Sequence, residues 1–569
     1  MKIGRKERRF EAAPNVQFAS SLHPNHIHPL KLSPNMLLLL FRSRVLNLRL
    51  DGLFSIRSIA ALMLLGLFLL QSCDKDAPEP PPFGQICLWD VPARQRYGFQ
   101  DVKGGPDSVD FIGRVYQGVT TGNCQTPDGQ KHPLVIVAHG RIAIGVPYNY
   151  LGMTYLTHHL ASWGDIVLSL NLDVVNSLQG EETEYGIPHR GELILHAIDY
   201  MLAQNRTPGS RFFQQIDTTK IALVGHSRGG GAVIYAANAN ARMHNHAIKA
   251  VATLSPANFG TEALQVPVPH ICLYGSWDGD LYEGQGPDLW SRGSRNAPRE
   301  LVEIYGANHY FFTDKAQFPS ESAEITREDH HLLAKGMVNA WFDRYLRGKN
   351  SFEWGRYLTG DIRLSNQLEY YVSFQHSEFL PITNNAENAD GGSEVKMGRM
   401  GTNILSVGLC DLADVELDGL PCYGTGTAVQ AGWDARNDRL EFVFAAMDAR
   451  PYPYLSFRMS QVHGDSLNEV DFKKDFHVHV TDARGVDAKV RVADYLGGLQ
   501  YPDLSGSLPP DDPNNRKQIM RGFRIPVADF QGIDFSKVTG VKFVFDRPAA
   551  KGFDNLSGAI KVADLEFSN

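Results

Sequence analysis

Between residues 84 and 350, short apolar runs alternate with longer amphipathic stretches. The apolar runs are rich in β-branched residues and predict strands buried on both faces. They cover residues 134–138, 165–170, 221–225, 249–254, 270–275 and 301–306. Helical spacing of apolar residues follows at 150–164, 190–205 and 327–348. Strands that alternate with helices predict a mostly parallel sheet with helices on both faces, with ligands beyond the carboxyl ends of its strands.

After about residue 350 the pattern changes to short alternating segments separated by Gly, Asp and Pro turns. Segments without intervening helices predict an antiparallel β-sandwich. They cover residues 368–374, 439–446, 475–482, 522–530, 538–546 and 559–567. The closing stretch "VTGVKFVFDRPAAKGFDNLSGAIKVADLEFSN" resembles the final strands of a jelly-roll module of the carbohydrate-binding type. Asp546 and Asp564 lie where such modules sometimes hold calcium, but turn and edge roles are an equal alternative, so we assign no metal site.

The sequence of the N-terminal region predicts a targeting segment and not a folded domain. Residues 59–70 form an uncharged run preceded by Arg57, which is typical of a signal peptide. The run is shorter than the roughly 20 residues of a spanning helix. It ends at Leu70-Gln71-Ser72-Cys73, which resembles the lipobox of bacterial lipoproteins, although Gln71 is a poor match. The resemblance implies lipidation at Cys73 and anchoring to a membrane of the bacterial envelope; a cleaved signal or simple anchor is the alternative.

Composition and charge limit the classes of function. The chain has 569 residues, 43% hydrophobic and 21% charged, which predicts a globular protein with more than one core. The net charge of -8, without a long basic run after the first ten residues, gives no support for a nucleic-acid partner. We expect an extension and signal peptide at 1–73, a Pro-rich tether at 74–83, an α/β domain at 84–350, a connector at 351–394 and a β-sandwich at 395–569.

The cysteines are interpreted in the light of export. In an oxidising compartment, proximity in sequence favours disulfides of Cys87 with Cys124 and of Cys410 with Cys422. Cys272 is then free inside an apolar strand. No Cys-x-x-Cys pair or His/Cys cluster at zinc spacing is present, so a structural metal site has little support.

The segment "IALVGHSRGGGAV" at 221–233 carries the pattern G-x-S-x-G around Ser227. An apolar strand precedes it and a helix-compatible run follows, the setting in which a strained turn lifts the serine hydroxyl above a sheet. A serine needs a base, and the base needs a carboxylate that orients it. Asp278 and Asp280 follow the run at 270–275, and His309 follows the run at 301–306. The order Ser, Asp, His fits this arrangement.

Backbone N–H groups must also face the oxygen on which negative charge develops. His139 and Gly140 end an early strand, so we assign the two donors to the N–H groups of Arg141 and Arg228. Four residues are tentative substrate contacts, each with a structural role as the alternative: His139, Gly140, His226 and Trp277. His330 and His331 are rival bases, but their charged helical surroundings predict a solvated face.

Residues 84–350 resemble the α/β-hydrolase superfamily, especially its dienelactone-hydrolase, chlorophyllase and platelet-activating-factor-acetylhydrolase-like esterases. The resemblance rests on the segments "AHG", "GHSRGG", "GSWD" and "GANH". It implies a serine esterase that needs no cofactor, with Ser227, His309 and Asp278 as its triad. Asp278 fits the Gly-x-x-Asp spacing of the family from Gly275, and Asp280 does not.

The expected function is an exported carboxylic ester hydrolase that acts through an acyl-enzyme on a small-molecule or polymer-borne ester. Its β-sandwich is expected to bind glycan or polymer. The alternative is a surface binding protein whose hydrolase-like domain is catalytically dead.

Overall fold

The computed structural model describes sixteen stretches of the chain. They are residues 83–92, 96–98, 108–119, 130–141, 149–177, 186–243, 245–281, 284–314, 322–349, 352–382, 396–397, 404–411, 427–434, 436–502, 519–548 and 550–569. All of them belong to one compact unit, residues 79–569. The signal segment, Cys73 and most of the tether lie outside the described residues. In the described stretches, no helix has the length and apolar character needed to cross a membrane.

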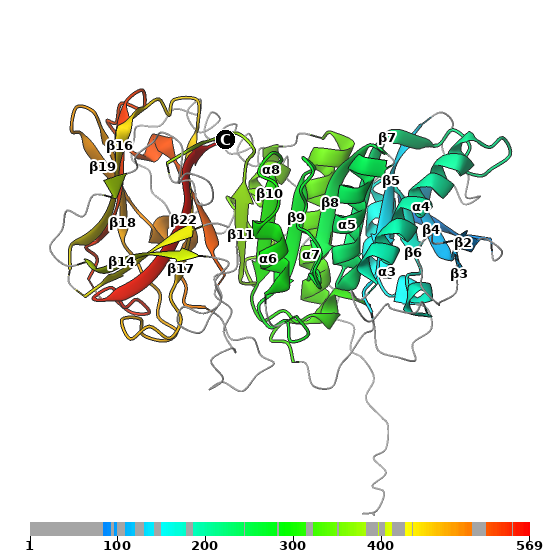
Figure 1. Cartoon of the computed structure of the whole chain (residues 1–569), viewed down its shortest axis with the longest axis horizontal. Helices are drawn as coiled ribbons and strands as arrows, with labels where there is room; N and C mark the ends of the chain where they lie inside the picture. The colour runs from blue at the N-terminus through cyan, green and yellow to red at the C-terminus, as the bar shows by residue number, and fades with distance from the viewer. Residues whose placement is uncertain are drawn as a thin grey trace, which may run out of the picture. The chain divides into compact units, whose positions relative to one another are not determined.

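The first part of this unit is built on a mixed sheet (Figure 1). Its described strands lie in the order β1-β4-β6-β5-β7-β8-β9-β10-β11. Neighbours from β6 to β10 are parallel, and the pairs at both edges are antiparallel. The strands are β1 (Gln85–Asp90), β4 (Gly113–Val119), β5 (His132–Ala138), β6 (Ile166–Leu170), β7 (Ile216–His226), β8 (Ile248–Leu254), β9 (His270–Gly275), β10 (Arg299–Ile304) and β11 (Tyr370–Gln375). All six strands predicted between 134 and 306 are present.

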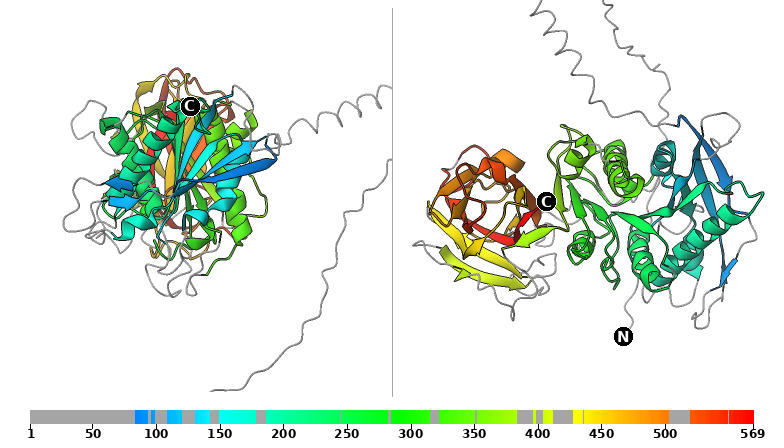
Figure 2. Two further views of the ribbon diagram at one scale, coloured as in Figure 1. Left: turned by 90° about the vertical axis from the view of Figure 1, so that its right-hand side faces the viewer. Right: turned by 90° about the horizontal axis from the view of Figure 1, so that it is seen from above.

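Helices cover both faces of this sheet, as the right-hand view in Figure 2 shows. On one face, α4 (Ile187–Arg206) and α5 (Arg228–Met243) pack against strand residues such as Ile136 and Leu223. On the other, α3 (Thr154–Ser162) and α7 (Arg327–Phe342) pack against residues such as Val135 and Val224. Alternate residues of one strand therefore enter different cores, which explains why the strands are apolar throughout. The shorter helices α6 (Gln285–Ser291) and α8 (Phe352–Leu358) lie near the β10 edge.

The strand predicted at 368–374 does not belong to the C-terminal sheets, with which its pattern had grouped it. It forms β11, which pairs antiparallel with β10 and makes the last strand of the large sheet. Alternation of polar and apolar residues identifies a strand but not the sheet it joins. The hydrogen-bonded sheet thus continues past residue 350, to Gln375.

The C-terminal part contains two further antiparallel sheets that share one apolar core. One has the strand order β14-β15-β22-β17-β20 with β12 beside β22, and the other has the order β13-β16-β21-β18-β19. The strands are β12 (Phe379–Pro381), β13 (Lys396–Met397), β14 (Ile404–Asp411), β15 (Thr427–Trp433), β16 (Asp438–Met447), β17 (Tyr454–Gln461), β18 (His477–Asp482), β19 (Asp487–Arg491), β20 (Arg521–Pro526), β21 (Val538–Phe545) and β22 (Gly558–Ser568). This is the predicted β-rich region; its jelly-roll character stays a prediction.

Buried ion pairs join the large sheet to the C-terminal sheets. The Arg521 guanidinium on β20 donates to the Glu303 carboxylate on β10 at 2.9 Å and 3.3 Å, and both side chains are almost fully buried. Nearby, Arg295 donates to Glu566 of β22 at 2.7 Å and 2.8 Å. Asp564, a tentative calcium position, instead pairs with Arg458 and accepts from the Gln375 amide at 2.9 Å. Among the described residues, no group of three metal-ligating side chains is present.

Two cysteines can be compared with the expected pairing. Cys87 in β1 is disulfide-bonded, and Cys272 in β9 is free and buried. Cys124, Cys422 and the side chain of Cys410 lie outside the described residues.

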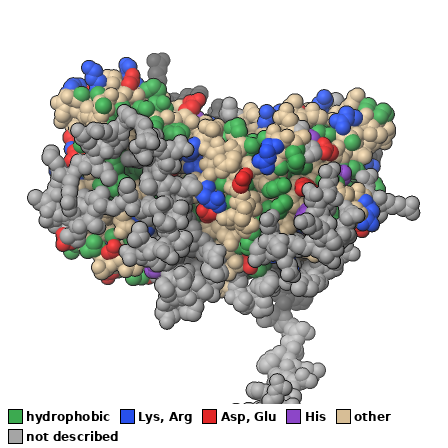
Figure 3. All heavy atoms as spheres, viewed as in Figure 1, with side chains coloured by type: hydrophobic (Ala, Val, Ile, Leu, Met, Phe, Trp, Pro, Cys, Tyr) green, Lys and Arg blue, Asp and Glu red, His purple; other side chains and the backbone are tan. Residues whose placement is uncertain are grey.

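On the face shown in Figure 3, basic and acidic side chains are interspersed over the described surface.

Candidate active site

Ser227 occupies a tight turn between β7 and α5. Its φ is 55°, the left-handed region that a non-glycine residue rarely adopts. The Ser227 N–H donates to the carbonyl of Leu254 at 3.1 Å, and the Ser227 carbonyl accepts the N–H of Gly230 at 2.8 Å and of Ala257 at 2.9 Å. The turn is therefore fixed from both sides by backbone bonds. Such strain is a feature of nucleophile elbows.

The two glycines of the pentapeptide are required by close backbone approaches. A Cβ on Gly225 would lie 2.2 Å from the carbonyl oxygen of Gly229. A Cβ on Gly229 would lie 2.2 Å from the carbonyl oxygen of Ala138, at the end of β5. Backbone atoms cannot yield as a flexible side chain can, so each position admits only glycine. The sequence pattern thus follows from the packing of β7, α5 and β5.

Asp278 and His309 meet at the carboxyl ends of β9 and β10. The Asp278 carboxylate accepts from Nδ1 of His309 at 2.8 Å and, through its other oxygen, from the N–H of Leu281 at 2.7 Å. Both side chains are buried. The loops that carry them are joined by bonds from Ser276, whose N–H donates to the carbonyl of Ile304 and whose hydroxyl accepts from the N–H of Gly306. The structure brings together the two residues that the sequence paired.

Asp280, the alternative to Asp278 for the orienting carboxylate, also lies close to the imidazole of His309. Its carboxylate lies 3.4 Å from Nε2 of His309, on the opposite side of the ring from Asp278. Its side chain is 45% exposed, whereas that of Asp278 is 0% exposed. No feature of the sequence predicted that both carboxylates would face one histidine.

Gly140 brings the β5 loop against the serine. A Cβ there would lie 2.5 Å from Cβ of Ser227 and 3.1 Å from its hydroxyl oxygen. The Arg141 N–H, next along the chain, makes no hydrogen bond to another described residue. Arg228 directly follows Ser227 and is the first residue of α5. Both predicted oxyanion donors are thus placed on segments that flank Ser227.

His139, a tentative substrate contact, is buried and binds backbone groups. Its Nε2 accepts the N–H of Leu172 at 2.8 Å, so its Nδ1 carries the proton and donates to the Gly140 carbonyl at 2.6 Å. Burial lowers the pKa of His139 to about 4, so its ring is neutral near pH 7. In a trans peptide the C=O and N–H point in opposite directions, so this bond orients the Arg141 N–H as well.

His226 and His330 support the loop that carries His309. His226 is buried, and its Nε2–H donates to the carbonyl of His309 at 3.0 Å. Burial and the neighbouring His309 charge lower the pKa of His226 to about 3. His330 is fully buried, which corrects the expected solvated face: its Nε2 accepts the N–H of Asn308 at 3.0 Å. The helical charge pattern around His330 did not show that its ring points into the core.

Trp277, between Ser276 and Asp278, is partly buried. Its N–H donates to the carbonyl of Ala307 at 2.9 Å. Its indole Nε1 is buried and has no hydrogen-bond partner in the described part of the chain. Contact of Trp277, His139, Gly140 and His226 with substrate stays a prediction.

Comparison with protein families gives one match. Residues 112–359 match the PET hydrolase-like family model. This match implies an α/β-hydrolase-type ester hydrolase over that region, in agreement with the superfamily expected from the sequence. The match does not distinguish among the dienelactone-hydrolase, chlorophyllase and platelet-activating-factor-acetylhydrolase-like esterases. A search of curated proteins found no match for the chain.

The PET hydrolase-like region contains every residue proposed for the site. It begins before β4 and ends after α8, so it includes the ends of β5, β7, β9 and β10. The C-terminal sheets lie beyond it.

Proposed function

We propose that the chain is a serine carboxylic ester hydrolase that acts through an acyl-enzyme, with Ser227 as nucleophile, His309 as base and Asp278 as the residue that orients the base. The observation that carries the proposal is the buried Asp278–His309 hydrogen bond at the same sheet end as the strained Ser227 turn. The PET hydrolase-like match supports the same class of chemistry.

In the proposed reaction, Nε2 of His309 takes the Ser227 proton while the serine oxygen attacks the ester carbonyl. The imidazolium then protonates the departing alkoxide, which leaves an acyl-serine. A water molecule, deprotonated by the same nitrogen, then attacks the acyl carbon. The bond from that carbon to the serine oxygen breaks, the imidazolium returns its proton to the serine oxygen, and the acid leaves. The buried Asp278 carboxylate holds Nδ1–H and stabilises the imidazolium that forms in both steps.

The negative oxygen of each tetrahedral intermediate would be held by the N–H groups of Arg141 and Arg228. The His139 bond to Gly140 keeps the first donor oriented before substrate arrives. Loss of one such donor in other hydrolases costs about 2.7–4 kcal/mol of transition-state stabilisation. None of the proposed steps uses a metal ion or an organic cofactor.

We further propose export through the segment at 59–70 and lipid anchoring at Cys73 in the bacterial envelope. The substrate would be a small-molecule or polymer-borne ester, since the chemistry at Ser227 does not depend on the size of the alcohol. The β-rich C-terminal region would act as an accessory binding module for glycan or polymer.

The decisive experiment compares wild type with Ser227→Ala on short-chain p-nitrophenyl esters. We expect the variant to lose at least about a thousandfold in kcat/KM, because the oxyanion donors alone give only residual catalysis. Mass spectrometry after treatment with a fluorophosphonate should show one adduct on wild type and none on the variant. Ser255→Ala, which alters a buried serine at the end of β8, is the matched control. Equal rates for wild type and Ser227→Ala would favour the non-catalytic binding protein.

A further inference from the structure

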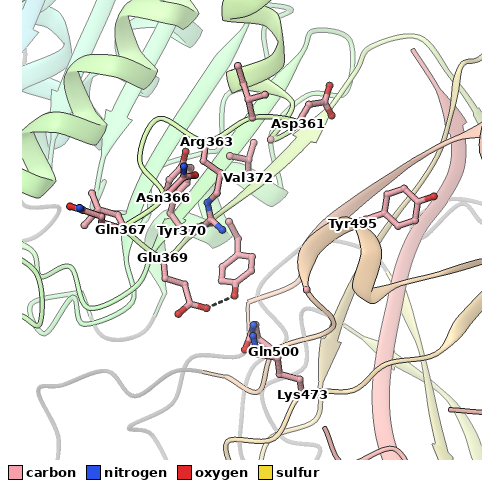
Figure 4. A pocket seen from close by; sticks show the side chains of 15 residues that line it. Asp361, Arg363, Asn366, Gln367, Glu369, Tyr370, Val372, Lys473, Tyr495 and Gln500 are labelled. Carbon is pink, nitrogen blue, oxygen red and sulfur yellow. Dashed lines mark hydrogen bonds between the residues drawn. The ribbon is translucent and has the colours of Figure 1, made fainter. Parts of the chain in front are cut away.

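A cleft of about 570 Å³ lies between the start of β11 and the C-terminal sheets. One wall is formed by residues 360–372, which lead into β11, and the other by residues around Lys473, Tyr495 and Gln500 (Figure 4). Its volume lies within the range of small-molecule sites. All of the lining residues lie beyond the end of the PET hydrolase-like match at residue 359.

The cleft lies at the catalytic end of the large sheet. Tyr370, at the start of β11, pairs with Ile304, the last residue of β10. The carbonyl of Glu369 accepts the N–H of Tyr305 at 3.0 Å, and His309 follows four residues later. Since β10 is parallel to β9, and β7 to β8 and β8 to β9, this is the sheet end that carries Ser227 and Asp278.

The charged side chains that line the cleft are balanced in sign, and two of them already make hydrogen bonds within the protein. Asp361 and Glu369 are opposed by Arg363 and Lys473. The Glu369 carboxylate accepts the Tyr371 hydroxyl at 2.6 Å, and Arg363 donates to the Tyr370 carbonyl at 2.7 Å. A cleft without an excess of either sign has no electrostatic preference for an anion or a cation. Its charge therefore suits a neutral ligand.

The neutral polar side chains of the lining are three amides and three tyrosines. Figure 4 shows the side chains of Asn366, Gln367 and Gln500 among the residues that line the cleft. An amide both donates and accepts, and so does the hydroxyl group of a sugar. The lining tyrosines are already engaged within the protein: the Tyr370 ring is 5% exposed and lies beneath the Arg363 guanidinium, and the Tyr495 hydroxyl donates to Asp529 at 2.8 Å. The amides of the lining, together with its balanced charge, match a neutral ligand that carries several hydroxyl groups.

We propose that this cleft binds a neutral saccharide unit and holds the sugar part of an ester-bearing glycan at the catalytic end of the sheet. The second half of this statement rests on the proposed ester hydrolysis at Ser227; the binding itself does not. The saccharide site then lies where the two parts of the chain meet, and not on an outer face of the C-terminal sheets.

Isothermal titration of the full chain with neutral oligosaccharides, such as xylohexaose, cellohexaose and mannohexaose, tests the binding. We expect at least one to bind, and Gln500→Ala and Asn366→Ala each to weaken it at least tenfold. Gln531→Ala is the matched control, because Gln531 is an exposed amide of the same region that does not line the cleft. Thermal melting of each variant checks that it is folded.

Three results would overturn the proposal: no binding of any neutral oligosaccharide, unchanged affinity in both cleft variants, or a preference for the anionic oligogalacturonide. Ser227→Ala separates this proposal from the proposed function. If that variant still hydrolyses esters, the triad assignment fails, but the titrations still test whether the cleft binds a saccharide. If it binds saccharide with wild-type affinity and has lost hydrolysis, both proposals are supported together.

Discussion

The Asp280 carboxylate lies 3.4 Å from Nε2 of His309, while the Asp278 carboxylate lies 2.8 Å from Nδ1 of the same ring. The two carboxylates differ in burial more than in distance, since Asp280 is 45% exposed and Asp278 is fully buried. Water screens an exposed pair, so its contribution is about 0–1 kcal/mol. A buried hydrogen bond that fixes the imidazole tautomer is worth far more.

Asp278→Asn should therefore lower kcat/KM by about 10³–10⁴, because the amide favours the wrong tautomer of His309. Asp280→Asn should lower it by less than about tenfold. Initial rates on a p-nitrophenyl ester at saturating and limiting concentrations measure both. A larger loss for Asp280→Asn would transfer the orienting role to that residue.

His139→Phe removes both the bond to the Leu172 N–H and the bond to the Gly140 carbonyl. If His139 positions the oxyanion loop, kcat should fall by about 10–100-fold while KM changes little, since the loss concerns transition-state binding. A rise in KM with constant kcat would instead indicate the substrate contact considered from the sequence. Trp277→Phe offers a comparison at a residue whose indole N–H has no bonded partner among the described residues.

Arg521→Leu leaves the Glu303 carboxylate buried without its ion pair. Removal of one partner of a buried pair costs about 3–5 kcal/mol, whereas replacement of both by apolar residues is often neutral. We expect the single variant to have a clearly lower unfolding temperature and Glu303→Leu/Arg521→Leu to recover most of the loss. Calorimetry of the two variants beside wild type measures this, and equal melting of all three would mean that the pair does not hold the sheets together.

Stability should fall as pH decreases from about 6.5 to about 4. Burial lowers the pKa of four histidines besides His139, to about 4 for His159 and His330 and to about 3 for His226 and His270. Over this range the unfolded chain binds protons that the folded chain excludes, which favours unfolding. Burial raises the pKa of Glu566 to about 7 and also raises the pKa values of Glu300 and Asp165. These carboxyls act in the opposite direction, because the stability gained from their raised pKa values is lost as pH rises. We expect the five histidines to outweigh the three carboxyls.

Unfolding temperatures between pH 7.5 and 4.5 test this balance. His270→Gln removes one of the titrating groups and should make the dependence on pH shallower. A melting temperature that stays constant or rises on acidification would contradict the prediction.

The positions of Ser227, Asp278 and His309 could be predicted because each follows its own apolar strand. In a parallel sheet the carboxyl ends of neighbouring strands meet at one edge, so residues remote in sequence become neighbours. The glycines around Ser227 gave further support, because their spacing reflects the backbone approaches between β7, α5 and β5.

Contacts that depend on loop conformation could not be predicted. Nothing in the sequence around Asp280 shows on which side of the His309 ring its carboxylate lies. The rings of His139, His226 and His330 bind backbone groups of other loops, and their neighbours in sequence carry no signal of this. Likewise, the alternation at 368–374 identified a strand but not its pairing with β10, which depends on the packing of the whole edge.

The left-handed backbone of Ser227 also limits which nucleophiles could ever occupy this position. A threonine has the required hydroxyl, but its β-branched side chain is a strong outlier at a φ of 55°. Cysteine is unbranched and close to serine in size. Among hydroxyl and thiol side chains, this turn therefore favours serine and cysteine over threonine at the proposed nucleophile position, and a cysteine variant would hold the acyl group of its substrate as a thioester.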